Sequence, residues 1–139
     1  MTISPASQSL TSLRMLVVDD NEATTKTFGW MLEALGHDVR LANDGPSAIA
    51  IAQSYVPHVI ILDISLPGMS GYEVCQKLRA EPVLENSVLV AQTGWSQPEY
   101  RERSRMAGFH HHLVKPVTLD RMQALIASLD IEKDRAVSC

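Results

Sequence analysis

The sequence predicts an α/β protein with a doubly wound, five-stranded parallel sheet. Two observations support this fold class. Short apolar runs alternate along the chain with segments whose apolar residues recur at helical spacing. Nearly every apolar run stops at a polar residue, as strands do at the edge of a sheet. Regular alternation requires right-handed crossovers, so helices must cover both faces of the sheet.

The first strand and helix are predicted from the chain's first apolar run. The run Arg-Met-Leu-Val-Val at residues 14–18 is apolar after its first residue and stops at the polar stretch 19–21, which is typical of a buried strand. Residues 22–35 then carry apolar side chains at helical spacing. Asn21 can cap the start of this helix, and Gly36 suits a left-handed cap at its end.

The same alternation continues through the middle of the chain. A strand at residues 38–42 and a helix at 46–55 precede an apolar strand at 58–62 that ends on Asp63. A loop containing Pro and Gly then leads into a helix at 72–79.

The last elements complete five strand–helix units. They are a strand at residues 88–92, a helix at 97–107, a strand at 110–114 and a helix at 118–129. Gly108 suits the end of the helix before it, and the two strands end on Thr93 and on Lys115.

Length and composition limit the class of protein. A chain of 139 residues supports one hydrophobic core, and no apolar run approaches the roughly 20 residues that span a bilayer. The net charge is -4, and basic residues are mixed with acidic ones. We therefore expect no membrane segment and no direct contact with nucleic acid.

The ends of the chain are expected to be tails around a single domain at residues 13–130. Residues 1–12 lack Lys, Arg and a continuous apolar run, so they do not resemble a secretory signal. Two cysteines are too few for a disulfide framework and fit a cytoplasmic location. Residues 131–139 are expected to form the second tail, and we expect no output domain in the ten residues after Leu129.

The residues that end the strands predict the functional site. In an open parallel sheet, ligands bind beyond the carboxyl ends of the strands. The polar groups expected to meet there are Asp19, Asp20, Asp63, Thr93 and Lys115. Three neighbouring carboxylates repel one another unless a cation lies among them. Mg2+ suits this site, because it prefers oxygen ligands and binds carboxylates together with a phosphate.

A phosphate ligand gives each residue type a role. A carboxylate nucleophile can form an acyl phosphate. Mg2+, the Lys115 ammonium and the Thr93 hydroxyl would neutralise charge on the equatorial oxygens. Any one polar residue at a strand end can be simply solvated, but the joint set matches one chemistry.

The chain resembles the receiver domains of response regulators over residues 13–129. The motifs are Leu-Val-Val-Asp-Asp-Asn from Leu16, Leu-Asp-Ile-Ser-Leu-Pro-Gly-Met-Ser-Gly-Tyr-Glu from Leu62, Thr-Gly at Thr93 and Leu-Val-Lys-Pro from Leu113. The residues around Thr93 and Lys115 are similar to those found in receivers attached to hybrid histidine kinases. The resemblance implies a flavodoxin-like sheet of order 2-1-3-4-5 and a two-component phosphorelay.

The resemblance also implies a role for each site residue. Asp63 would accept the phosphoryl group, with Lys115 and Thr93 contacting it. Mg2+ would be bound by Asp19, Asp20, Asp63 and the backbone carbonyl of Ser65. The backbone of Ile64, Ser65 and Gly94 would contact the phosphoryl group. The peptide bond before Pro116 would be cis, a geometry accessible to proline.

The implied partners are a histidine kinase or a histidine phosphotransfer protein, and a separate effector protein. The effector would bind the face formed by the fourth helix, the fifth strand and the fifth helix. Whether the chain forms a weak homodimer stays open. Beyond its own phosphorylation and dephosphorylation, no enzyme activity is expected.

Two residues depart from the family's usual pattern. His112 occupies the position of an aromatic switch residue, three before Lys115, and we expect it to move with Thr93 on phosphorylation. Trp95 lies where the family tunes access of water, so it is a candidate for slowing hydrolysis. The run of three histidines at 110–112 is not expected to bind metal, because neighbouring strand residues face opposite sides.

The sequence disfavours two other functions and leaves a third as an alternative. A Mg2+-dependent phosphatase generally has a second acid two residues after its nucleophile, where this chain has Ser65. A flavin site would need a phosphate-binding loop after the first strand, where this chain has acids. A phosphorylation-independent binding module on the same fold remains the alternative.

Overall fold

The computed structural model describes residues 12–94 and 98–129, and every element of the sheet lies within them. The elements are β1 (Arg14–Val18), α2 (Glu22–Ala34), β2 (Asp38–Ala42), α3 (Gly45–Tyr55), β3 (Val59–Asp63), α4 (Gly71–Arg79), η1 (Pro82–Leu84), β4 (Val88–Thr93), α5 (Pro98–Ala107), β5 (His111–Val114) and α6 (Leu119–Ser128). The predicted alternation is confirmed, and most boundaries agree within one residue. The short 3-10 turn η1 was not predicted. Residues 1–11 and 131–139 of the expected tails, together with Trp95 and Gln97, lie outside the described residues.

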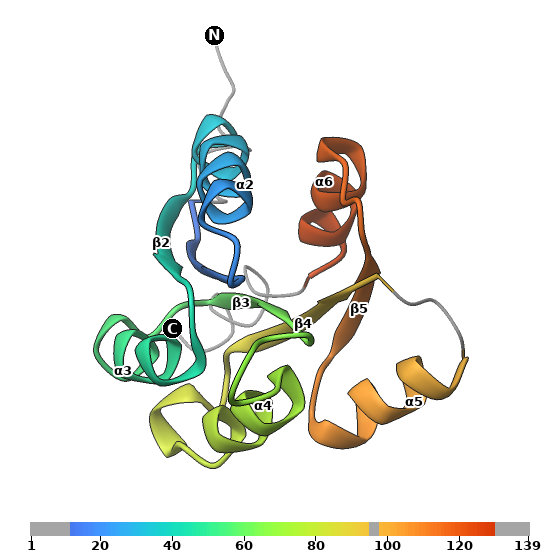
Figure 1. Ribbon diagram of the computed structural model, residues 1–139. Coiled ribbons are helices and arrows are strands. Elements are labelled where there is room, and N and C mark those ends of the chain that lie inside the picture. The colour runs from blue at the N-terminus through green and yellow to red at the C-terminus, as the bar shows by residue number, and fades with distance from the viewer. Residues whose placement is uncertain (1–11, 95–97, 130–139) are drawn as a thin grey trace, which may run out of the picture.

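The five strands form one parallel sheet in the order β2-β1-β3-β4-β5. This confirms the fold class and the strand order. Helices α2 and α6 cover one face, and α3, α4 and α5 cover the other (Figure 1). No helix of these described residues is long and apolar enough to cross a membrane.

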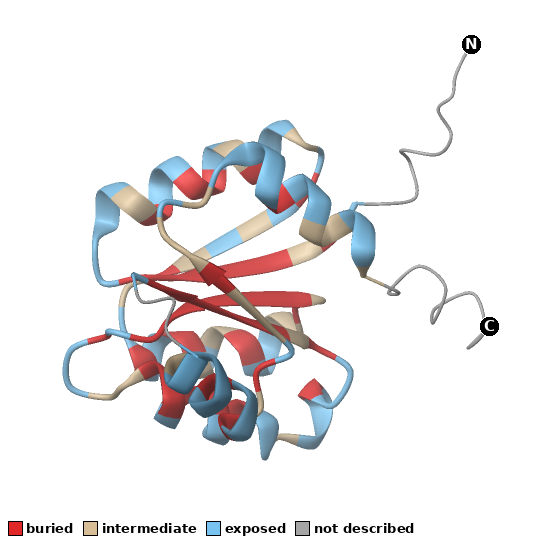
Figure 2. Ribbon diagram, turned by 90° about the vertical axis from the view of Figure 1, so that its right-hand side faces the viewer, coloured by how far each residue is buried: buried red, intermediate tan, exposed pale blue. Residues whose placement is uncertain are grey.

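Each face of the sheet has its own apolar core. Leu16, Ile60 and Leu62 pack against α3 and α4 on one side. Met15 and Ile61 point to the other side, where α2 and α6 cover them. Figure 2 shows buried residues along the sheet and on the inner sides of the helices. The alternation follows from the period of two along a strand, and β3 is buried on both faces.

Local signals in the sequence define the helix ends. The Asn21 side chain accepts from the Thr24 N–H over 3.0 Å, which caps α2 as predicted. Gly36 follows α2 with φ 97°, and Gly108 follows α5 with φ 114°. Both glycines therefore adopt the left-handed conformation expected where a helix stops. These helix ends position the loops at the two edges of the sheet.

Candidate phosphoacceptor site at the carboxyl edge of the sheet

Two neighbouring strands bring Asp19 and Asp63 together. β1 and β3 are adjacent and in register, with Val18 opposite Leu62, so the residues that follow lie at the same edge. Asp19 is 1% exposed and Asp63 is 3% exposed, whereas Asp20 faces solvent. One carboxylate oxygen from each of the three acids lies within 4.8 Å of the others. The predicted acidic cluster therefore exists in the folded chain.

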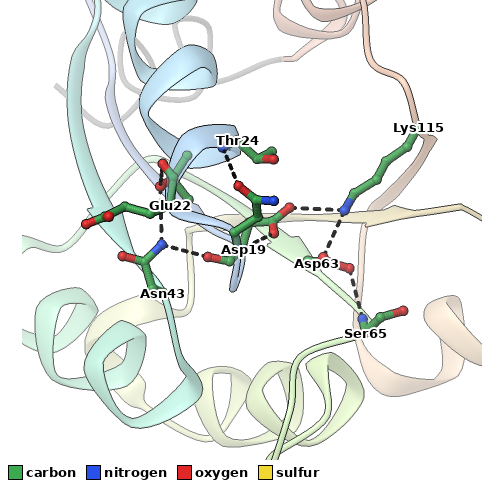
Figure 3. A network of polar contacts seen from close by, with 9 residues as sticks. Asp19, Glu22, Thr24, Asn43, Asp63, Ser65 and Lys115 are labelled. Atoms are coloured by element: carbon green, nitrogen blue, oxygen red, sulfur yellow. Dashed lines mark hydrogen bonds and ion pairs between the residues drawn. The ribbon is translucent and has the colours of Figure 1, made fainter.

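Lys115 reaches this cluster from the loop after β5. Its Nζ donates to Asp63 Oδ2 over 2.9 Å and to Asp19 Oδ2 over 3.0 Å (Figure 3). The Lys115 N–H donates to the carbonyl of Thr93 over 2.7 Å, and the peptide bond to Pro116 is cis. One ammonium group thus contacts both buried carboxylates.

The backbone holds the other oxygen of each buried carboxylate. Asp19 Oδ1 accepts from the Asn21 N–H, and Asp63 Oδ1 accepts from the Ser65 N–H, both over 2.9 Å. These are the local bonds that Asp side chains make to residues two positions ahead. Together with Lys115, they fix the orientation of both carboxylates.

Burial and charge act in opposite directions on the pKa values of this pair. Burial raises the pKa of Asp63 above its usual value of 3.8, although hydrogen bonds to Lys115 and Ser65 oppose the rise. Burial also disfavours the charged form of Lys115, but its hydrogen bonds to Asp63 and Asp19 raise the pKa of the ammonium overall. Lys115 therefore remains a cation near neutral pH, next to an unusually basic carboxylate.

The donor set fits a hard divalent cation. The three acids offer only oxygen atoms, and their close spacing leaves negative charge that one ammonium does not balance. A cation bound by Asp19, Asp20 and Asp63 would remove this repulsion. Mg2+ is therefore compatible with the residues present.

The remaining predicted residues surround the cluster. Thr93 ends β4 and is fully buried, and a Cβ atom added to Gly94 would meet open space. The Ile64 N–H donates to the carbonyl of Gln92 over 3.0 Å, and the Ser65 N–H is bound to Asp63. Both donors are thus occupied in this conformation, and their contact with a phosphoryl group stays a prediction.

His112 lies on β5 and contacts α5 instead of the acidic cluster. Its Nδ1 is 3.2 Å from the hydroxyl of Ser104, which also donates to the Tyr100 carbonyl over 3.0 Å. Ser104 is 1% exposed, so this polar contact is covered by α5. Sequence reasoning did not identify Ser104, because nothing in a helical pattern shows which polar residue will face a particular strand.

Asn43, in the loop after β2, was also missed. Its side chain donates to the Asp19 carbonyl over 2.8 Å. The rule that polar residues at strand ends meet at one edge includes Asn43, which directly follows the strand at Asp38–Ala42. The sequence therefore contained the signal for Asn43, but the prediction used only the ends of the other four strands.

The fold and site define an open α/β protein with a lysine-bound carboxylate cluster at the carboxyl edge of its sheet. Residues 15–127 match the model of the response regulator receiver domain. The response regulator PleD of Caulobacter vibrioides is 36% identical over 118 residues, which are 85% of this chain and 26% of PleD. The polar-differentiation response regulator DivK of Brucella anthropi is 31% identical over 114 residues, 82% of this chain and 93% of DivK.

Solved structures show the same fold. The chemotaxis protein CheY4 of Vibrio cholerae superposes with a TM-score of 0.80 at 26% identity, over 84% of this chain and 98% of CheY4. The receiver domain of the sensor histidine kinase PA1611 of Pseudomonas aeruginosa has a TM-score of 0.76 at 28% identity, over 84% and 95%. That structure has a magnesium ion coordinated in its active site cleft.

The chain belongs to the response regulator receiver domain family. Receiver domains act in two-component signalling, in which they interact with histidine kinases or phosphotransfer proteins and with effectors. Receiver domains are generally non-enzymatic signalling modules. The chain spans about a quarter of PleD, so the activities of that whole protein are not assigned to it.

Proposed function

We propose that Asp63 is the phosphoacceptor of a two-component phosphorelay. A histidine kinase or a histidine phosphotransfer protein would supply the phosphoryl group. The observation that carries this proposal is the position of Lys115, whose Nζ contacts Asp63 and Asp19 at the edge where Asp20 completes the acidic cluster. A buried carboxylate beside a fixed cation suits a nucleophile that must receive an anionic group.

The transfer exchanges one bond to phosphorus for another. A lone pair on an Asp63 carboxylate oxygen forms the O–P bond, and the P–N bond of phosphohistidine breaks. The electron pair of that bond returns to the imidazole nitrogen, and one proton on the ring, supplied by solvent, makes the released imidazole neutral. In hydrolysis, a water oxygen forms a new bond to phosphorus and the bond between phosphorus and the Asp63 oxygen breaks. Inorganic phosphate leaves, the proton from water passes to solvent, and the electron pair restores the Asp63 carboxylate.

Each neighbouring residue has a proposed task in this transfer. Lys115 neutralises charge on the arriving phosphoryl group, and Thr93 contacts it after transfer. Asp19, Asp20, Asp63 and the Ser65 carbonyl hold Mg2+, which when bound stabilises negative charge on the phosphoryl oxygens. Gly94 supports the phosphoryl contact, because the open space where a Cβ atom would lie leaves room for its backbone to approach a phosphoryl group.

The signal would leave the site through the face formed by α5, β5 and α6. His112 lies on this face, and its contact with Ser104 links β5 to α5. Phosphorylation selects between two conformers only to the extent that it interacts differently with them. We infer that movement of Thr93 and His112 changes how this face binds a separate effector protein in the cytoplasm.

Intact-mass spectrometry after incubation with acetyl phosphate tests the proposal. We expect a Mg2+-dependent phosphoryl adduct on the wild type and on Asp44→Asn, and none on Asp63→Asn. Asp44 is an exposed aspartate that caps α3, so it controls for the loss of a carboxylate elsewhere. A folded wild type that accepts no phosphoryl group from acetyl phosphate or from a phosphorylated phosphotransfer protein would contradict the proposal and favour a phosphorylation-independent binding module.

A further inference from the structure

The loop between β2 and α3 contacts the loop that carries the acidic residues. Asn43 Nδ2 donates to the carbonyl oxygen of Asp19 over 2.8 Å (Figure 3). It also donates to Thr25 Oγ1 over 3.2 Å. The Thr25 hydroxyl in turn donates to the Glu22 carbonyl over 2.9 Å. Both hydrogens of the Asn43 amide are therefore used on the segment from Asp19 into the first turns of α2.

The Asp19 carbonyl belongs to the peptide group that joins Asp19 to Asp20. Because a peptide group is planar, fixing its oxygen also fixes the direction in which the chain enters Asp20. The buried Asp19 carboxylate has further partners, since Asn21 and Lys115 hold its two oxygens. Asn43 thus acts on the backbone between two acids of the cluster.

Asp20 depends on this backbone for its orientation. It is exposed, and among the residues that the structure describes no hydrogen bond or ion pair holds its carboxylate. An exposed carboxylate without a partner is free to rotate away from Asp19 and Asp63. The peptide orientation therefore sets the direction in which the Asp20 side chain leaves the backbone, toward the carboxylates of Asp19 and Asp63.

Asn43 is not needed to begin the helix that follows it. The neighbouring Asp44 caps α3 by accepting from the Ser47 N–H over 2.8 Å. The side chain of Asn43 faces the acidic loop instead, and Thr25, its second partner, is fully buried. Two adjacent polar residues in one loop therefore serve different structures.

We infer that Asn43 is a positioning residue for metal binding, because it holds the Asp19–Asp20 peptide so that Asp20 faces Asp19 and Asp63. The inference rests on the proposed function, in which these acids bind Mg2+. Replacing a residue that orients metal ligands typically lowers the metal affinity by about 10- to 100-fold. Removing the Asn43 amide should weaken Mg2+ binding by about tenfold.

Isothermal titration calorimetry of the full chain with MgCl2 tests this inference. We expect Asn43→Ala to bind Mg2+ about tenfold more weakly than the wild type. Asn43→Leu keeps the branched shape of the side chain but donates nothing, so it should show the same loss without leaving a cavity. Circular dichroism at each titration temperature establishes that the variants are folded.

Ser87→Ala is the matched control. The Ser87 hydroxyl also donates to a backbone carbonyl, that of Pro57 over 2.7 Å, and it lies at the start of β4, at the opposite edge of the sheet. This variant loses the same kind of bond and should bind Mg2+ like the wild type. Equal weakening by Ser87→Ala would attribute the effect to general destabilisation and overturn the inference.

The outcomes separate this inference from the proposed function. A wild type that binds Mg2+ together with Asn43 variants that bind it equally well would overturn the role of Asn43 alone. A wild type that binds no Mg2+ would overturn the proposed metal site, and the inference with it. Weakening in both Asn43 variants but not in Ser87→Ala would establish the positioning role.

Discussion

Lys115 Nζ lies 2.9 Å from Asp63 Oδ2, although 52 positions separate the two residues. The ammonium also lies 3.0 Å from Asp19 Oδ2, so it bridges two carboxylates that are almost completely buried. The Lys115 side chain itself is 33% exposed. It therefore neutralises buried charge while remaining accessible at the edge of the sheet.

Replacing Lys115 by Met should make stability depend more strongly on Mg2+. Without the ammonium, two buried carboxylates repel each other, and we expect the free energy of unfolding in EDTA to fall by about 1–3 kcal/mol, because the pair is intermediate between exposed and buried. A divalent cation can replace the missing charge, so Mg2+ should stabilise Lys115→Met more than the wild type. Urea unfolding with EDTA and with Mg2+ measures both effects. Lys77→Met removes an exposed lysine from α4 and should respond to Mg2+ like the wild type.

The close approach of the Asp63–Ile64 backbone should require glycine at position 71. A Cβ atom at Gly71 would lie 2.5 Å from the Asp63 carbonyl oxygen and 2.5 Å from Ile64 Cα. Both are backbone atoms, so no side-chain rotation relieves the contact. We expect Gly71→Ala to lower the free energy of unfolding by about 1–3 kcal/mol and to slow phosphorylation of Asp63.

Gly94→Ala provides the comparison for Gly71→Ala. Among the residues that the structure describes, no heavy atom beyond the chain neighbours lies within 4 Å of a Cβ built at Gly94, so this substitution should change the free energy of unfolding little. Urea unfolding of the two variants measures the difference. Equal stability of Gly71→Ala and the wild type would show that the backbone around Asp63 yields easily.

The sequence predicted the fold and most of the candidate site for one physical reason. Apolar periodicity defines strands and helices, and alternation of the two forces parallel strands whose carboxyl ends meet at one edge. Asp19, Asp63 and Lys115 could therefore be grouped from the sequence alone, although Lys115 lies far along the chain. Such predictions need only the direction and order of the strands.

Contacts that depend on helix packing could not be predicted in this way. Ser104 is one of several polar residues on α5, and only the rotation of that helix against β5 brings it to His112. The position of Asn43 at the end of a strand could be predicted from the sequence. Its bond to the Asp19 carbonyl could not, because that bond depends on the path of two loops. Side-chain partners of this kind require the folded structure.

The Ser104 hydroxyl should stabilise α5 against β5. Ser104→Ala removes its contact with His112 and its bond to Tyr100, and a buried hydrogen bond contributes about 1 kcal/mol. Amide hydrogen exchange in α5 should therefore become about fivefold faster. Ser54→Ala removes an exposed hydroxyl that donates to the Ile51 carbonyl in α3, and it should leave exchange in α5 unchanged. Identical exchange rates in Ser104→Ala and the wild type would remove the proposed link between β5 and α5.

His110 lies at the amino end of β5 and accepts a hydrogen bond in its neutral form. Its Nδ1 accepts from the Leu89 N–H over 3.0 Å. Burial lowers the pKa of His110 below its ordinary value of 6.5, and the nearby charge of Arg79 lowers it further. Burial also lowers the pKa of His111. Both imidazoles are therefore neutral in the folded protein over a range of pH in which the unfolded chain begins to bind protons.

This difference in pKa should make the protein less stable in mild acid. Where the unfolded state binds more protons, stability rises with pH, so the contribution of His110 is complete above pH 6.5 and is lost as the pH falls below it. His110→Asn keeps an acceptor for the Leu89 N–H but does not titrate. Urea unfolding at about pH 7.5 and about pH 5.5 should show a smaller decrease for this variant than for the wild type, with His111 contributing the remaining slope. An unchanged decrease in His110→Asn would mean that other groups cause the loss of stability in acid.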